Sequence, residues 1–178
     1  MSINVKKSSC IRIGHRHSVT CASITACQGQ PLHWVSEFRY LGVFIVSSRS
    51  FKCSLTYAKR SFYAAVNGLF GKILNSASDE VILELVRTKC TPILLHGLEC
   101  FQLGKADLHS LDFTFNRLCM KLFKTGSIQV VRDCQSYFAT DLPSCDLKRR
   151  QDKFIIRYIS TDHRDRFLPI LLQAVIHS

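Results

Sequence analysis

The sequence predicts an α+β protein, because its apolar residues follow two different periods in two parts of the chain. Over the first fifty residues they alternate or cluster in short runs, which is typical of strands. Beyond residue 50 they recur at steps of three and four, which is typical of amphipathic helices. We therefore expect a small β-hairpin or sheet at 1–50, a helical bundle at 51–145 and a basic helical tail at 146–178.

The strands are expected in three short apolar runs. These runs are CIRIG (10–14), VTCASIT (19–25) and FRYLGVFIV (38–46), with a turn at GQPL (29–32) before the last. Gly42 interrupts the third run, and a glycine inside a strand permits a bulge or the close approach of another backbone. The three runs together predict a small sheet.

The helices are expected between cap residues and breaking residues. Ser54 is a good N-cap for a helix that reaches to about Leu74, and Ser78 begins a second helix that Pro92 kinks or ends. Asp79 and Glu80 favour the positive end of that helix dipole. Apolar spacing predicts further helices, at 106–123, 127–138 and 146–159.

The charge of the chain indicates an anionic partner. Lys and Arg number 24 against 13 Asp and Glu, which gives a formal charge of +11. Such a surplus attracts phosphate backbones or anionic lipid heads. No apolar stretch reaches the roughly 18 residues that span a bilayer, and MSINVKKSSC lacks the apolar core of a signal peptide. We expect an intracellular protein of the nucleus or cytoplasm, not secreted, with no membrane partner and no small-molecule substrate.

The nine cysteines have spacings that do not indicate a metal site. Their number is odd and no CxxC pair occurs, whereas structural zinc sites nearly always use such pairs. We expect reduced, mostly buried thiols that act as small hydrophobes, and no bound metal. A metal-dependent module is the alternative, for which His15, His17 and Cys21 are the candidate ligands.

Three motifs in order resemble the end of the reverse transcriptase domain of non-LTR (LINE-type) retrotransposons. NVKKS (4–8) is similar to the N-x-x-K-[ST] element that ends the palm's fourth motif, and the YLG within FRYLGVFI (38–45) to the fifth. KCTPILLHGLE (89–99) resembles the thumb element P-x-L-x-Y-G-x-E, with His96 in place of the usual Tyr. The resemblance covers approximately residues 3 to 157.

The resemblance implies the end of a palm followed by a thumb, without a catalytic centre. The family holds two metal ions on a palm aspartate and an adjacent aspartate pair, and this sequence contains no Asp-Asp pair. We therefore expect no polymerase activity from the chain alone and no cofactor, although the intact family enzyme would use Mg. The front of the family's domain is expected to be missing, which would leave exposed apolar sheet edges and marginal stability.

The resemblance also implies site residues. Lys7, with Lys6 as the alternative one residue earlier, matches a lysine that lies near the phosphates of the incoming nucleotide. Tyr40, Leu41 and Gly42 match the turn that supports the primer's 3′ end. The family's thumb grips a duplex through its phosphates, so the expected partner is RNA or an RNA–DNA duplex, bound weakly through its backbone.

The lysines and arginines of the helical part are the candidate phosphate contacts. The expected set is Lys59, Arg60, Lys121, Lys124, Lys148, Arg149, Arg150, Lys153 and Arg157, with Lys52, Lys72 and Arg117 as further candidates. The cluster from Lys148 to Arg157 is the densest, and Phe154 and Tyr158 within it would either stack on bases or pack in the core. The alternative is a helical protein-interaction module with no nucleic-acid role.

Overall fold

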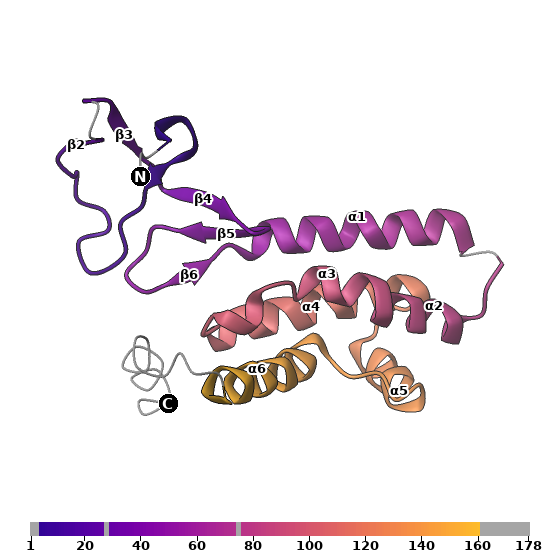
Figure 1. Ribbon diagram of the computed structural model, residues 1–178. Coiled ribbons are helices and arrows are strands. Elements are labelled where there is room, and N and C mark those ends of the chain that lie inside the picture. Colours follow the sequence, from indigo (N-terminus) through magenta and orange to yellow (C-terminus); the bar gives the residue numbers. More distant parts are fainter. Residues whose placement is uncertain (1–3, 27–28, 74–75, 161–178) are drawn as a thin grey trace. The chain divides into compact units, whose positions relative to one another are not determined.

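The computed structural model describes residues 4–26, 29–73 and 76–160, and it confirms the α+β class (Figure 1). Small sheets occupy the N-terminal part and helices the remainder. The chain forms two compact units, residues 1–57 and residues 58–178. Each unit is described by itself below.

The first unit contains two three-stranded sheets. After a 3-10 turn, η1 (Val5–Lys7), one sheet has the order β1-β3-β2, and the other has the order β4-β5-β6. Strand β3 runs parallel to β1 and antiparallel to β2, whereas all pairs in the second sheet are antiparallel. The strands are β1 (Ser9–Cys10), β2 (Ile24–Thr25), β3 (Pro31–Trp34), β4 (Glu37–Tyr40), β5 (Val43–Val46) and β6 (Lys52–Cys53).

The strand expectations were right about the presence of sheets and wrong about several boundaries. FRYLGVFIV is a hairpin and not one strand, because Leu41 (φ 47°) and Gly42 (φ 90°) form a two-residue turn between β4 and β5. Positive φ at both central residues is the signature of a type I′ turn. The expected GQPL turn runs directly into β3 at Pro31. CIRIG contributes only Cys10 to a strand, since the chain turns at Gly14 (φ 126°).

The first unit buries little apolar surface. Among its described residues, Ile45 and Leu55 are the buried hydrophobic side chains. Phe44 of β5 adds a ring stacked on Tyr57, with centroids 3.6 Å apart. Several large apolar side chains stay exposed in this unit, namely Ile13, Val19, Ile24, Trp34, Tyr40, Leu41 and Phe51. A core of this size gives a unit of this length only marginal stability.

The second unit is a helical bundle whose helices begin close to the expected residues. Ser78 caps α2 and Ser127 caps α5, each accepting a hydrogen bond from the backbone N–H three residues later at 3.5 Å. The elements are α1 (Leu55–Ile73), α2 (Asp79–Leu85), η2 (Val86–Cys90), α3 (Thr91–Leu94), η3 (Leu98–Cys100), α4 (Lys105–Leu122), α5 (Ile128–Tyr137) and α6 (Pro143–Ser160). Helix α1 begins at the end of the first unit.

Pro92 does not end its helix. The chain continues from α2 through a π-helical turn, η2, into α3, with Pro92 in the first turn of α3. A proline lacks the N–H that donates a hydrogen bond in a regular helix. A π-helical turn changes the hydrogen-bond spacing next to the proline, so the helix can continue. Thr91 supports this turn, since its hydroxyl donates to the carbonyl of Val86 at 3.3 Å.

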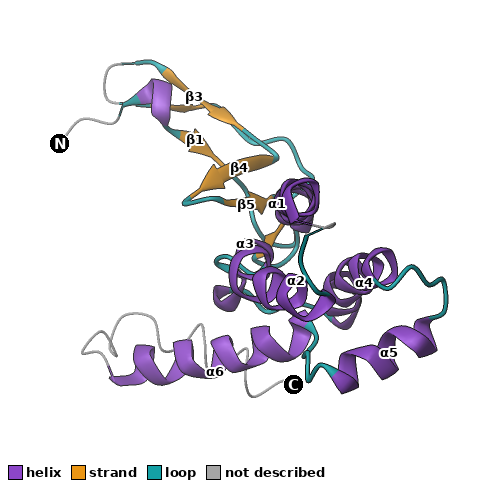
Figure 2. Cartoon of the chain, turned by 90° about the vertical axis from the view of Figure 1, so that its right-hand side faces the viewer, coloured by secondary structure: helices purple, strands orange, loops and turns teal. Residues whose placement is uncertain are grey.

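The core of the bundle lies between α1, α4 and the α2–α3 segment, and α6 packs onto it (Figures 1 and 2). Leu147 anchors α6 because its side chain is fully buried. The Asp112 carboxylate of α4 accepts a hydrogen bond from the Ser144 N–H at 2.9 Å, and Gln151 Nε2 donates to the Phe101 carbonyl at 3.0 Å. Within the described ranges, no helix is long and apolar enough to cross a bilayer.

Candidate nucleic-acid interface

Helices α1 and α4 lie side by side and run in the same direction. Near their N-terminal ends, Lys59 Nζ of α1 donates a hydrogen bond to Ser110 Oγ of α4. Near their C-terminal ends, the Lys121 ammonium of α4 lies over the Phe70 ring of α1, 5.2 Å from its centroid. These two contacts fix the register of the two helices.

A groove of about 550 Å³ runs between the two helices in this register. Its lining residues are Tyr63, Val66, Asn67 and Phe70 of α1 and Arg117, Leu118 and Lys121 of α4. We call this surface, with Lys59 at its end, the α1–α4 groove. Val66, Phe70 and Leu118 are buried and form its floor. The side chains of its rim are exposed and polar, so the groove combines an apolar base with charged walls.

Helical spacing explains why each helix contributes a stripe of residues to the groove. Lys59, Tyr63, Asn67 and Phe70 follow one another at steps of four, four and three, so they lie on one face of α1. Ser110, Arg117 and Lys121 share a face of α4 for the same reason. The packing of α1 on α4 then turns two separate stripes into one groove.

The cations of the groove keep their charge available. Lys121 is held in place by its contact with the Phe70 ring, a cation–π interaction that leaves the ammonium without a neutralising anion. Among the described residues, no carboxylate forms an ion pair with Lys59, Arg117 or Lys121. The groove is therefore positively charged through Arg117 and Lys121, which line it, and half-buried Lys59 adds a third cation one turn before Tyr63.

Of the expected phosphate contacts, Lys121 lines this groove together with the further candidate Arg117, and half-buried Lys59 lies at the other end, one turn before Tyr63. Arg60 is exposed next to Lys59 on α1, and Lys124 is exposed just beyond the end of α4, with φ 51°. Lys72 is also exposed on α1, but the spacing places it on the side away from Tyr63.

The basic cluster of α6 lies apart from the groove. Figures 1 and 2 show α6 and α1 on opposite sides of the α2–α3 segment. Arg149 and Lys153 lie on the side of α6 turned away from Leu147, Arg150 and Arg157 lie nearer to Leu147, and Lys148 lies on the other flank. These side chains are exposed except Arg150, which is half-buried. The α6 cluster is therefore a second, separate basic surface.

Arg149 is a weaker candidate than its neighbours. Its guanidinium pairs with Asp141 and with Asp146, the latter at 2.7 Å. A phosphate would have to compete with both carboxylates for this side chain. Phe154 and Tyr158 of the same helix are half-buried and lie near each other, with ring centroids 6.3 Å apart.

The candidate residues of the first unit form two exposed turns. Lys7 ends the 3-10 turn η1, and its side chain is exposed. Tyr40, Leu41 and Gly42 are exposed at the tip of the β4–β5 hairpin, where 59% of Tyr40 and 78% of Leu41 is accessible. The side chains of Lys7, Tyr40 and Leu41 are thus accessible to solvent, and the roles that the resemblance implies for these residues stay predictions. Lys52 is exposed on β6.

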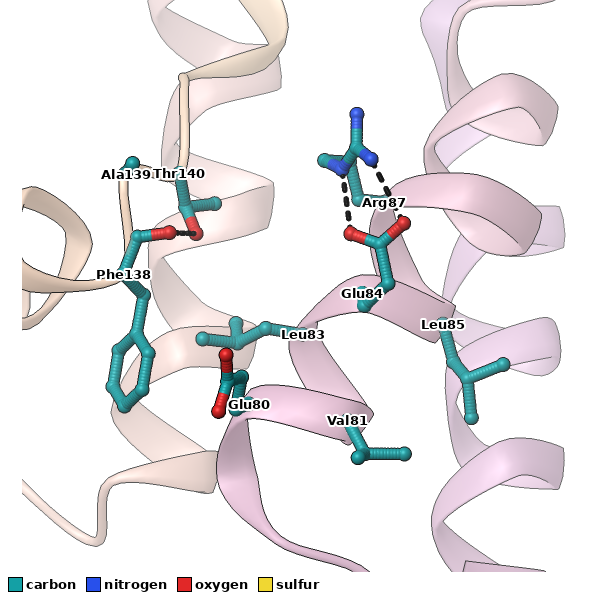
Figure 3. A pocket seen from close by; sticks show the side chains of 9 residues that line it. All are labelled: Glu80, Val81, Leu83, Glu84, Leu85, Arg87, Phe138, Ala139 and Thr140. Carbon is teal, nitrogen blue, oxygen red and sulfur yellow. Dashed lines mark hydrogen bonds and ion pairs between the residues drawn. The ribbon is translucent and has the colours of Figure 1, made fainter.

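A second pocket, also of about 550 Å³, has the opposite charge (Figure 3). It is lined by Glu80, Leu83 and Glu84 of α2 and by the Phe138–Thr140 segment after α5. Arg87 donates two hydrogen bonds to Glu84, at 2.8 and 2.9 Å, and these bonds lower the pKa of Glu84. The carboxylates make this pocket unsuitable for a phosphate.

The thiols and histidines form no metal site in the part of the chain that the structure describes, where no three potential ligands lie together. Arg12 Nη1 donates to Cys21 Sγ at 3.0 Å, and His17 Nδ1 contacts the Gly14 carbonyl at 3.2 Å. Burial raises the pKa of the Cys119 thiol to about 11, and it also raises the pKa of Cys90.

Sequence reasoning missed the polar groove residues that are not cationic. Tyr63 and Asn67 lie at steps of four from Lys59, and this i, i+4, i+8 spacing is the signal that was available. Ser110 had no signal, because only the packing of α4 against α1 brings it to Lys59.

Comparison with known proteins identifies no relative of the chain. No family model matches the sequence, and neither a curated protein nor a solved structure matches it. The functional argument therefore depends on the residues of the chain and on the surfaces they form.

Proposed function

We propose that this chain is a sequence-independent nucleic-acid-binding module, corresponding to the palm end and thumb of a non-LTR reverse transcriptase and inactive as a polymerase by itself. The observation that supports binding is the alignment of Lys59, Arg117 and Lys121 along the α1–α4 groove. The resemblance of NVKKS, YLG and KCTPILLHGLE to that family's motifs supports the assignment to a reverse transcriptase. The lack of an Asp-Asp pair is the reason to expect no catalysis.

A phosphate backbone fits this groove in charge and in the type of contact. Arginine offers a planar fork of donors that binds phosphate through two hydrogen bonds, and lysine offers a compact point charge. Such contacts carry no sequence information, so binding would not depend on the base sequence. The partner is an RNA or RNA–DNA duplex, and its affinity comes mainly from released counterions.

The test is the salt dependence of binding to a labelled RNA–DNA duplex, measured by fluorescence anisotropy. Three neutralised phosphates would give a slope of log affinity against log salt of about −2.7. The affinity would then fall about 40-fold between 50 and 200 mM salt. A flat response, or no binding at 50 mM salt, would refute the proposal.

Matched variants assign the effect to the groove. The double substitution Arg117→Gln and Lys121→Gln removes two of the three cations, so the slope should become shallower by about 1.8. Lys72→Gln removes one charge from the far side of α1 and serves as the control, with an unchanged slope expected. Equal losses per charge removed in both proteins would show that net charge, and not the groove, binds the duplex.

A protein-interaction module is the second candidate, because α6 exposes apolar side chains. Ile155, Ile156 and Ile159 are 38%, 67% and 45% accessible. Exposed apolar side chains that gather on one surface are typical of contacts with another protein. The anisotropy series separates the two candidates, since this alternative predicts no salt-dependent duplex binding at all.

A further inference from the structure

We propose that the α1–α4 groove holds one unpaired nucleotide of the bound strand, with its base against Tyr63 and its phosphate between Arg117 and Lys121. This inference rests on the proposed function and goes beyond it, because a backbone-binding thumb needs only the cations. The groove also offers an aromatic ring and an amide, which a backbone contact does not use.

Tyr63 is the ring that a base can reach. Its side chain is partly exposed. The ring packs in a T-shaped arrangement against Phe62, a fully buried ring whose centroid lies 5.8 Å away. Phe70, the other aromatic residue of the groove, is not available, because it is 6% accessible and the Lys121 ammonium lies over its ring. The geometry thus leaves Tyr63 as the stacking platform of the groove.

The length of the groove matches a base with its phosphate. Tyr63 and Phe70 lie two turns apart on α1, about 10 Å along the axis. Lys121 is positioned over Phe70, and Arg117 lies one turn before it on α4. Arg117 and Lys121 therefore lie toward one end of the groove, and the free ring of Tyr63 lies toward the other, one turn after Lys59.

Asn67 lies between the two ends. It is exposed on α1, one turn after Tyr63, and it lines the groove. Its amide carries both a donor and an acceptor, which is what the edge of an unpaired base requires. A volume of about 550 Å³ also falls within the range of sites that hold small ligands.

The ligand must be unpaired, because the bases of a duplex stack on one another and present no free face to a side chain in a groove. Aromatic side chains bind nucleic acids by stacking on splayed or single-stranded bases. The chemistry required is a base joined to a phosphate, and this could come from an unpaired nucleotide in a strand or from a free mononucleotide. We assign the nucleotide to a strand, because a strand carries further phosphates that the cations of α6, a second basic surface, can bind. A free mononucleotide has no such phosphates.

The test compares a blunt RNA–DNA duplex with the same duplex carrying a four-nucleotide unpaired 3′ extension, by anisotropy at fixed salt. One stacked base should make the extended probe bind about tenfold tighter. In Tyr63→Leu, which keeps an apolar side chain but removes the ring, the ratio of the two affinities should fall to about one. Tyr63→Phe should restore the ratio, because it keeps the ring.

Tyr137→Leu is the matched control, because Tyr137 is an 84% accessible tyrosine of the same unit that does not line the groove. A ratio near one in the unchanged protein, or an equal ratio in the Tyr63→Leu variant, overturns the inference. Salt-dependent binding of the blunt duplex would still support the proposed function in that case. The last probe is adenosine monophosphate. If its binding free energy equals the free energy that the unpaired extension adds to duplex binding, the source is a free nucleotide, and the assignment to a strand is overturned.

Discussion

The attachment of α6 to the bundle can be tested at Asp112, whose carboxylate reaches from α4 to the first turn of α6. It accepts a hydrogen bond from the Ser144 N–H at 2.9 Å, and both residues are half-buried. The N–H groups of the first turn have no partner within their own helix. Asp112 therefore acts as a cap supplied by a different helix, and Asp112→Ala removes it.

The expected loss of stability follows from two contributions. Replacing an N-cap by alanine costs about 1 kcal/mol, and losing a negative charge at the positive end of a helix dipole costs up to about 1 kcal/mol more. We expect Asp112→Ala to lower the free energy of unfolding by about 1.5 kcal/mol. Asp112→Asn keeps an acceptor oxygen and loses only the charge, so it should cost about 0.5 kcal/mol.

Urea denaturation followed by helical circular dichroism measures both losses. With an m value of about 2 kcal/mol/M, the midpoint should fall by about 0.7 M for Asp112→Ala and by about 0.25 M for Asp112→Asn. Asp133→Ala is the control. Asp133 is an exposed residue of α5, and its carboxylate accepts a hydrogen bond from the Gln129 amide of the same helix. Equal midpoints for Asp112→Ala and this control would refute the idea that α4 caps α6.

Three further predictions concern stability and reactivity. Leu147→Ala should lower the free energy of unfolding by about 3 kcal/mol, because a fully buried leucine is removed, and urea denaturation would show it. Hydrogen exchange should be fast in residues 4–26 and 29–57 and slow in α4, since Ile45 is one of very few buried side chains among the described residues of the first unit. Equal protection in both units would contradict this. Iodoacetamide at pH 8.5 should alkylate the exposed Cys145 much faster than the buried Cys119. The pKa of the Cys119 thiol is raised to about 11, so this thiol forms the reactive thiolate only as the pH rises toward that value. Mass spectrometry of the two peptides checks it, and equal rates would show that Cys119 is not buried.

Most helices were predictable because the signals that define them are local. The caps Ser78 and Ser127 lie just before apolar residues at steps of three and four, and the structure places α2 and α5 directly after them. The strands were less predictable, because their pairing depends on turns. The chain reverses at Leu41, a residue type that rarely adopts positive φ, so the apolar run through it looked like one strand.

The basic residues show the same distinction between local and distant contacts. Counting charges predicted that α6 would be the best phosphate contact, and its residues are indeed mostly exposed. Asp141, which lies outside the helix and eight residues before Arg149, reduces the charge that this arginine can offer. Spacing within the helix does not reveal that partner, because it comes from the loop before α6.

The sequence by itself determined the α+β class, the positions of most helices and the positive charge, since composition, period and caps act over a few neighbouring residues. Only the tertiary structure decided which cations share a surface. Lys59 and Lys121 belong to helices far apart in the chain, and periodicity assigns each to a face without saying which helix packs beside it. The parallel packing of α1 on α4, through the Lys59–Ser110 and Phe70–Lys121 contacts, joins those faces into the α1–α4 groove.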